Sequence, residues 1–151
     1  MANKIISNSF HEGMMIIKFG FSGTRRGMSQ FQKDFLFGLL QDKAGEFHHG
    51  DCVGADSEAH DIATALGYKV YVHPPLDESL RAYKTGAVQY PKLPYKVRNK
   101  NIVEKTVVLL AFPLEFNGRG GTWNAIEWAK RLGRQFYICL PNGEIYHDDD
   151  P

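Results

Sequence analysis

The chain has 151 residues, of which 43% are hydrophobic and 23% charged, and its formal net charge is +1. A chain of this length can bury a hydrophobic core within one domain. A charge so close to zero supplies no strong overall field, so nucleic acid is not expected as a partner. No apolar run approaches the roughly 20 residues that cross a bilayer, and no membrane partner is expected.

Cysteine and histidine patterns argue against the common metal sites. Cys52 and Cys139 lack metal-ligand spacing and form no disulfide framework, which favours a reduced cytoplasmic setting. His48 and His49 are adjacent, so on a strand their side chains would point to opposite faces. The sequence contains no zinc signature. We therefore expect neither a metal ion nor another cofactor.

Strand and helix patterns alternate along the chain. In chain order they predict strand 14–20, helix 28–40, strand 46–50, helix 55–67, strand 68–75, helix 95–105, strand 106–113, helix 122–133 and strand 134–141. Residues 76–94 lack periodicity and are expected to form a long surface excursion. Alternation of this kind is typical of a parallel sheet with helices on both faces. We predict an α/β fold, a single doubly wound, Rossmann-like domain.

The ends and the surface of this domain carry three further expectations. Residues 1–13 should form an arm or an extra strand, and residues 144–151 an acidic, frayed tail. Helices on both faces leave an aromatic-rich surface, which favours a homo-oligomer of unknown stoichiometry.

Three glycine-rich loops each follow a predicted strand and open a helix: GFSGTRRG at 20–27, HHGDCVGAD at 48–56 and NGRGGT at 117–122. In an open parallel sheet, ligands bind beyond the carboxyl ends of the strands. A helix N-terminus attracts anions through its unpaired amides, and glycine lets the backbone approach phosphate oxygens. A tight turn would explain any one of these loops. Three together favour a phosphate-binding site.

Two common phosphate fingerprints are missing from these loops. The first loop has the wrong glycine spacing for a dinucleotide-binding motif, and no loop has the Gly-Lys-Ser/Thr ending of a Walker motif. The sequence therefore does not predict an ordinary dehydrogenase or P-loop NTPase.

The order and spacing of several motifs resemble the SLOG superfamily, the Rossmann-like group named for the Smf/DprA and Lonely Guy proteins. The similarity covers about residues 16–143 and is greatest to small stand-alone bacterial and phage members. The matching segments are GFSGTRRG, HHGDCVGADSEAHDIATALG, VHPP, RNKNIVEKTVVLLAFP and GGTWNAIEWAKRLG.

This resemblance implies a pocket for a nucleotide or a nucleotide-derived ligand. The family's Gly-Gly-Thr loop wraps a phosphate, a second loop lies opposite, and a third lies near the ribose or base. An Arg-Asn pair before the fourth predicted strand would reach the pocket, with the arginine as a phosphate clamp. The implied ligand-binding residues are Gly20, Ser22, Gly23, Thr24, Arg25, Gly50, Asp51, Gly54, Arg98, Asn99, Gly120, Gly121 and Thr122.

One departure from the family concerns catalysis. The Lonely Guy enzymes carry Pro-Gly-Gly-x-Gly-Thr-x-x-Glu, but here Ala125 occupies the glutamate position and the nearest glutamate is Glu127. Two residues along a helix correspond to about 200° of rotation, so Glu127 cannot simply substitute. For an enzyme, Asp51 and Glu127 are the candidate acid/base residues. Asp56 is a weaker candidate, because its position also suits a helix cap.

Three functions are compatible with these patterns. The first is binding of a nucleotide or of an NAD- or ADP-ribose-like ligand. The second is a nucleotide N-glycosidase related to the Lonely Guy enzymes. The third is a DprA-like single-stranded nucleic-acid binder, against which the near-neutral charge counts.

Overall fold

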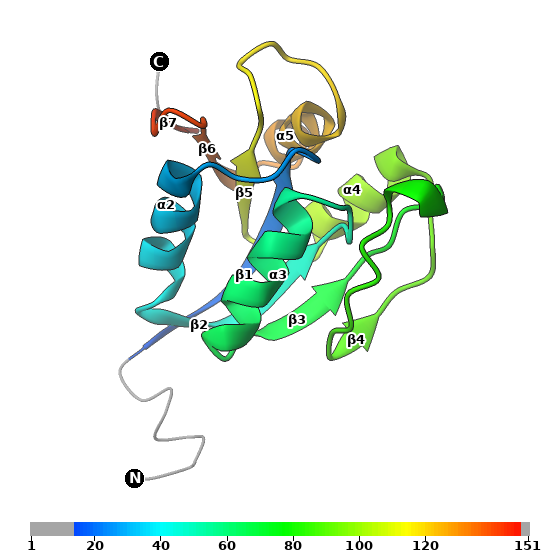
Figure 1. Cartoon of the computed structure of the whole chain (residues 1–151), viewed down its shortest axis with the longest axis horizontal. Helices are drawn as coiled ribbons and strands as arrows, with labels where there is room; N and C mark the ends of the chain where they lie inside the picture. Colours follow the sequence, from blue (N-terminus) through cyan, green and yellow to red (C-terminus); the bar gives the residue numbers. More distant parts are fainter. Residues whose placement is uncertain (1–13, 149–151) are drawn as a thin grey trace, which may run out of the picture.

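The computed structural model describes residues 14–148, so the arm or strand expected at residues 1–13 lies outside the described residues. A seven-stranded sheet with the order β4-β3-β2-β1-β5-β6-β7 runs through the molecule (Figure 1). Its strands are β1 (Met15–Gly23), β2 (Lys43–His49), β3 (Lys69–Val72), β4 (Val88–Gln89), β5 (Val108–Phe112), β6 (Gln135–Cys139) and β7 (Ile145–His147). Every neighbouring pair is parallel except β6 and β7, which are antiparallel.

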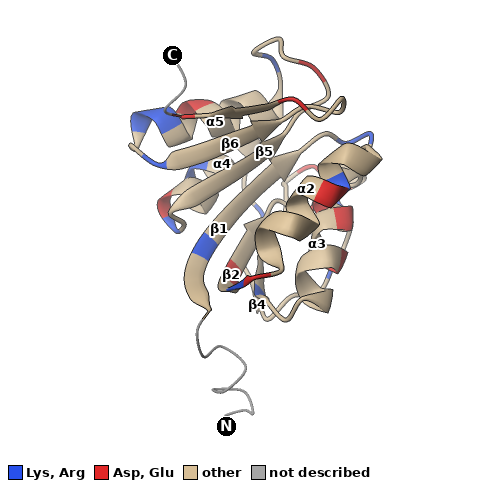
Figure 2. Ribbon diagram, turned by 90° about the vertical axis from the view of Figure 1, so that its left-hand side faces the viewer, with Lys and Arg blue, Asp and Glu red and all other residues tan. Residues whose placement is uncertain are grey.

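Helices cover both faces of this sheet, as Figure 2 shows from the side. They are α2 (Gln30–Leu40), α3 (Ala55–Ala65), α4 (Tyr95–Glu104) and α5 (Gly121–Arg131), with a 3₁₀ turn η1 (Glu78–Leu80). The α/β, doubly wound fold predicted from the sequence is therefore confirmed.

Each face of the sheet packs into its own cluster of buried apolar side chains. Alternation along β1 sends Phe19 and Phe21 to the face that α2 and α3 cover. Leu109 and Ala111 of β5 point to the opposite face, where they pack against α5. All five residues of β5 are buried, which matches its position inside the sheet.

Ser29 begins α2 as its N-cap, and its hydroxyl accepts a hydrogen bond from the amide of Gln32. The Gln32 side chain completes a capping box and then donates to the carbonyls of Pro113 and Cys139, at 3.2 and 2.8 Å. This buried amide ties α2 to the ends of β5 and β6.

Two segments contain more regular structure than the sequence indicates. The excursion at 76–94 contains η1 and β4, and the tail expected to be frayed contains β7. At β7 the expectation is wrong because a turn closed by Gly143, at φ 93°, returns the chain along β6. Pairing with β6 satisfies backbone groups that an edge strand would otherwise expose.

The chain changes direction across the sheet between β1 and β5. It builds β1 to β4 outward on one side, then crosses through α4 to β5 on the other side of β1. The carboxyl ends of β1 and β5 are paired neighbours, with Gly23 opposite Phe112. In open α/β sheets such a switch point is where ligands bind. None of the helices within residues 14–148 has the length and hydrophobicity to cross a membrane.

The register of β1 and β2 leads to a stability prediction. Gly45 lies opposite Ile17 at φ 135°, and an added Cβ would collide with the Ile17 carbonyl. We expect Gly45→Ala to lower the free energy of unfolding by about 2 kcal/mol or more, measured by urea denaturation.

Gly38 in α2 is the matched control for this change, because no atom lies within 4 Å of its added Cβ. Gly38→Ala should raise the free energy of unfolding by about 0.5–1 kcal/mol, since alanine favours a helix. Equal destabilisation by the two substitutions would contradict the register.

Candidate ligand-binding cleft

A cleft of about 760 Å³ opens at the carboxyl ends of β1 and β5. Its lining comes from the loops after β1, β2 and β5, from both arms of the excursion after β3, and from the first turns of α3, α4 and α5. The lining residues are 22–25, Cys52, Asp56, 75–77, Leu80, 94–95, Arg98, 113–115, Asn117 and 119–123.

The N-terminus of α5 is built of glycine and is open to this cleft. Gly120 is the N-cap at φ 92°, a conformation that other residues adopt only with strain, and no side chain of the described residues caps the helix. A Cβ on Gly120 would meet no atom within 4 Å, and one on Gly121 would meet only Tyr95, at 4.0 Å. Dense packing therefore does not explain these two glycines.

The loop after β1 faces this helix start, as the sequence motifs implied. The Ser22 hydroxyl donates to the Thr122 hydroxyl at 3.3 Å, so the two loops meet across the switch point. Gly23, Thr24 and Arg25 continue the same wall. Eight of the implied ligand-binding residues thus line one cleft: Arg98 of α4, two from the end of β1, two from the loop after it and three from the start of α5.

Arg98 lies in the cleft and is only 6% exposed. Its Nη1 donates to the carbonyls of Gly50 and His73, at 2.6 and 3.2 Å, and its Nε donates to the Asn99 side chain at 2.8 Å. No carboxylate within residues 14–148 forms an ion pair with it. Arg98 is therefore a buried cation held by neutral acceptors.

Asn99 does not line the cleft but joins two of its walls. Its amide nitrogen donates to the carbonyl of Gly121 at 3.0 Å and to the side chain of Asn124 at 3.1 Å. Its oxygen accepts from Arg98. Asn99 thus fixes the arginine and the start of α5 relative to each other.

Asp56 is the carboxylate that lies in the cleft beside Arg98. It is 4% exposed, and its Oδ2 accepts from the amides of Gly50 and Cys52, at 3.1 and 3.2 Å. Its Oδ1 has no hydrogen-bond partner within residues 14–148, although the Gly23 amide is near enough to favour the charged form. Burial raises the pKa of this carboxyl to about 6, against the lowering effect of Arg98 and these amides.

The expectation that Asp56 caps α3 is wrong. Gly54 is the N-cap, without a side-chain hydrogen bond, and Asp56 is the second residue of the helix. Its carboxylate instead closes the loop between β2 and α3.

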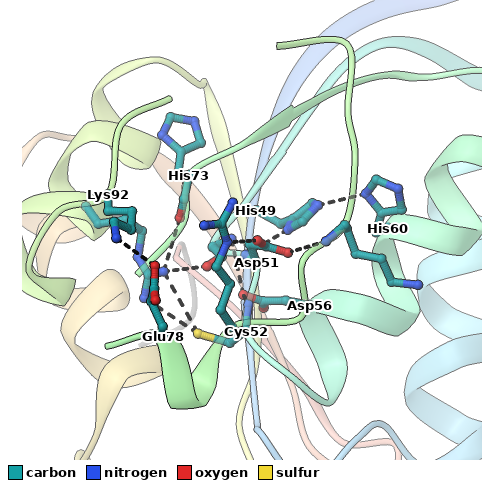
Figure 3. Close-up of polar contacts among 12 residues, drawn as sticks. His49, Asp51, Cys52, Asp56, His60, His73, Glu78 and Lys92 are labelled. Atoms are coloured by element: carbon teal, nitrogen blue, oxygen red, sulfur yellow. Dashed lines mark hydrogen bonds and ion pairs between the residues drawn. The ribbon is translucent and has the colours of Figure 1, made fainter. Parts of the chain in front are cut away.

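Asp51 is buried away from the cleft, contrary to the expectation that it contacts a ligand. Its backbone is in the left-handed region at φ 54°, and its carboxylate accepts from the Arg81 side chain at 3.0 Å and from the Lys84 amide at 2.9 Å. Its own amide donates to His49, which is paired with His60 (Figure 3). Asp51 therefore anchors the excursion to the end of β2.

Glu127 also lies outside the cleft. It is exposed on α5 and forms an ion pair with Lys130 at 3.8 Å, one turn further along the helix. The structure therefore brings neither candidate acid/base residue to the lining of the cleft.

Three of the implied glycines have packing reasons instead. A Cβ on Gly20 would meet Thr106 and the helix α4, and one on Gly54 would collide with the backbone of Arg25. A Cβ on Gly50 would meet both Arg98 and Asp56. None of the three glycines lines the cleft, but the close approach at Gly50 lets the cation and the carboxylate lie side by side.

The sequence motifs did not indicate the outer walls of the cleft. One wall comes from the aperiodic excursion, which contributes Leu76, and from Tyr95 at the start of α4. The other comprises residues 113–115, which precede the NGRGGT motif in the loop after β5. Trp123 holds this segment, because its indole nitrogen donates to the Glu115 carbonyl at 3.0 Å. Figure 1 shows this loop rising beyond the end of β5. In the sequence, the prolines that flank the excursion were the only sign of these walls.

Four histidines form two buried pairs on opposite faces of β2. His48 contacts His73 at 2.9 Å, and His49 contacts His60 at 2.9 Å. Burial lowers the pKa of all four, to about 3 for His73. No cluster of three or more metal-ligating side chains occurs within the described part of the chain.

Comparisons with known proteins show the fold. No protein-family model matches the chain, and no curated protein matches its sequence. The solved structure of DNA processing protein A (DprA) from Streptococcus pneumoniae matches with a TM-score of 0.59 and 19% identity, covering 82% of this chain and 50% of DprA. The structural-genomics target TM1055 matches with a TM-score of 0.57 and 21% identity, covering 82% of this chain and 72% of TM1055.

The chain therefore has the Rossmann-like fold of DprA, one of the proteins for which the SLOG superfamily is named, and spans about half the length of DprA. The fold that the resemblance implied is confirmed.

The buried titratable groups predict how stability depends on pH. The lowered pKa values of His48, His49, His60 and His73 mean that, below about pH 6.5, the unfolded chain binds protons that the folded chain does not. Acidification from pH 7.5 to 5 should therefore lower the free energy of unfolding, by roughly 2 kcal/mol, measured by urea denaturation.

Asp56 acts in the opposite direction. Its raised pKa lets the folded chain keep a proton between about pH 6 and 4, where the unfolded carboxyl has lost it. Asp56→Asn should therefore make the loss of stability on acidification steeper. A profile that is flat in the unsubstituted protein would contradict the neutral state of the histidine pairs.

Proposed function

We propose that this protein binds a nucleotide or a nucleotide-derived ligand, of the NAD or ADP-ribose type, in the cleft at the β1–β5 switch point. One observation carries the proposal: the uncapped, glycine-built N-terminus of α5 opens into the same cavity as the buried cation Arg98. Free helix amides and a guanidinium together form an anion site.

The electrostatics of Arg98 support an anionic group on the ligand. Burying a guanidinium costs free energy unless a partner compensates its charge, and here the partners are two carbonyls and an amide oxygen. Asp56 lies beside Arg98 and, with a pKa of about 6, balances part of this charge above that pH. The exposed Arg25 and Arg119 add positive charge at the rim of the same cleft.

The size and lining of the cleft suit a ligand larger than phosphate alone. A volume of about 760 Å³ is within the usual range for small-molecule sites, roughly 300–1,000 Å³. Polar groups are concentrated at the starts of α3 and α5, while Pro75, Leu76 and Leu80 supply apolar surface. A phosphorylated ligand with an apolar portion matches this division.

The N-glycosidase alternative has less support, because Asp51 and Glu127 lie outside the cleft lining. Asp56 is the carboxyl in the cleft whose pKa, about 6, suits acid/base chemistry. Incubation with nucleotides and NAD, followed by chromatography for free base, tests this alternative. Release of base that Asp56→Asn abolishes would establish it over simple binding.

The likeness to DprA raises nucleic-acid binding as the other alternative. The two proteins share the fold only, and a net charge of +1 over 151 residues attracts nucleic acid weakly. Oligonucleotide binding with a steep salt dependence would favour it over a nucleotide ligand.

The proposal is tested by a thermal-shift series with nucleoside mono- and diphosphates, NAD and ADP-ribose, combined with mass spectrometry of any small molecule that co-purifies. A ligand at 100 times its Kd adds about 2.7 kcal/mol to the free energy of unfolding. Stabilisation by none of these compounds would count against the proposal.

Gly121→Val should abolish this ligand-induced stabilisation. The position has room for a β-carbon, with only Tyr95 at 4.0 Å, so the fold should persist by circular dichroism. The branched side chain would nevertheless keep a phosphate from the first amides of α5.

Gly38→Val is the matched control, because it makes the same change in a helix and does not touch the cleft. The control should keep the full ligand-induced shift. An unchanged shift in Gly121→Val would show that the phosphate lies elsewhere.

A further inference from the structure

Tyr95 is a half-exposed aromatic side chain without a ring partner. Of the seven tyrosines, all within the described residues, six stack on or lie beside another ring or a cation: Tyr68, Tyr71, Tyr83, Tyr90, Tyr137 and Tyr146. Tyr95 has no such contact within residues 14–148, and 46% of it is exposed. An aromatic ring left open in a cleft is a surface on which a planar ligand group can stack.

The position of this ring is set by the start of α4. Tyr95 is the first residue of the helix after Pro94, and Arg98 lies three residues further on, on the same side of the helix. The ring edge is 4.0 Å from the position of a Cβ on Gly121. Tyr95 therefore stands beside the proposed phosphate site, one helical turn from the buried arginine.

The surface that continues from Tyr95 into the cleft is apolar. The two arms of the excursion are joined where the Leu76 amide donates to the Leu93 carbonyl at 3.0 Å. This pairing brings Pro75 and Leu76 close to Pro94 and Tyr95. The Leu76 side chain is 55% exposed. Asp77 is the charged residue of this arm that lines the cleft, and its carboxylate disfavours a second phosphate there.

We propose that Tyr95 is the residue that recognises the base: its ring stacks on the heteroaromatic base of the ligand, whose phosphate lies at the N-terminus of α5. The inference rests on the proposed function and assigns the orientation of the ligand. The base lies toward the excursion, against Tyr95 and Leu76, and the ribose joins it to the phosphate between Arg98 and the start of α5.

Calorimetric titration with two kinds of probe separates the contribution of the base from that of the phosphate. Ribose 5-phosphate tests the phosphate site alone, and AMP, GMP, CMP and UMP add a base. The unsubstituted protein should bind its preferred nucleoside monophosphate about 5- to 150-fold more tightly than ribose 5-phosphate, the range expected for one stacked base.

Tyr95→Ala should remove this preference, by weakening nucleotide binding by the same factor while leaving the affinity for ribose 5-phosphate within about twofold. Tyr95→Phe should keep the preference, because the ring and not the hydroxyl makes the contact. Tyr83→Ala is the control: Tyr83 is 58% exposed but does not line the cleft, so both affinities should be unchanged.

Two results would overturn the assignment of Tyr95 while leaving the proposed function intact. One is an equal loss for nucleotide and ribose 5-phosphate in Tyr95→Ala, which would mean that the ring only supports α5. The other is a preference for nucleotide that Tyr95→Ala retains. If the unsubstituted protein binds none of the five probes, the nucleotide-monophosphate site is absent and the assignment of Tyr95 fails with it.

Discussion

The buried guanidinium of Arg98 is the interaction on which the cleft depends. It comes from α4, donates hydrogen bonds to carbonyls at the ends of β2 and β3, and is linked through Asn99 to the start of α5. Four elements that are distant in sequence are thus held around one charge. Because a buried cation is costly unless it is hydrogen-bonded, this network also fixes the relative positions of the loops.

The same burial shapes the chemistry beside the arginine. Asp56 and Arg98 both lie close to Gly50. Burial raises the pKa of the Asp56 carboxyl, because it disfavours the charged form. The thiol of Cys52, 3.9 Å from Nη1 of Arg98, is also kept neutral, since burial raises its pKa to about 11. The cleft therefore combines a permanent positive charge with a neutral thiol and with a carboxyl that loses its charge only below about pH 6.

Local patterns in the sequence predicted much of this arrangement. The apolar runs identified the strands, and helical spacing of apolar residues identified α2, because these features depend only on near neighbours. The segments at Ser22–Gly23 and Gly120–Gly121 were recognised because three glycine-rich loops each follow a strand and open a helix. The excursion was harder to interpret, since its short elements form only by pairing with distant chain.

The sequence by itself determined the alternation of strands and helices, and with it the edge of the sheet at which the glycine loops gather. Only the tertiary structure decided which side chains of those loops face the cleft. Asp51 and Asp56 are only five residues apart, in the loop after β2 and in the first turn of α3. A left-handed backbone at Asp51 and its contact with Arg81 make the first an anchor, whereas the second lies beside Arg98. Likewise, Tyr95 reaches the mouth of the cleft only because α4 packs against α5. These side-chain positions depend on contacts between segments that are far apart in the chain, and the local spacing of residues does not encode such contacts.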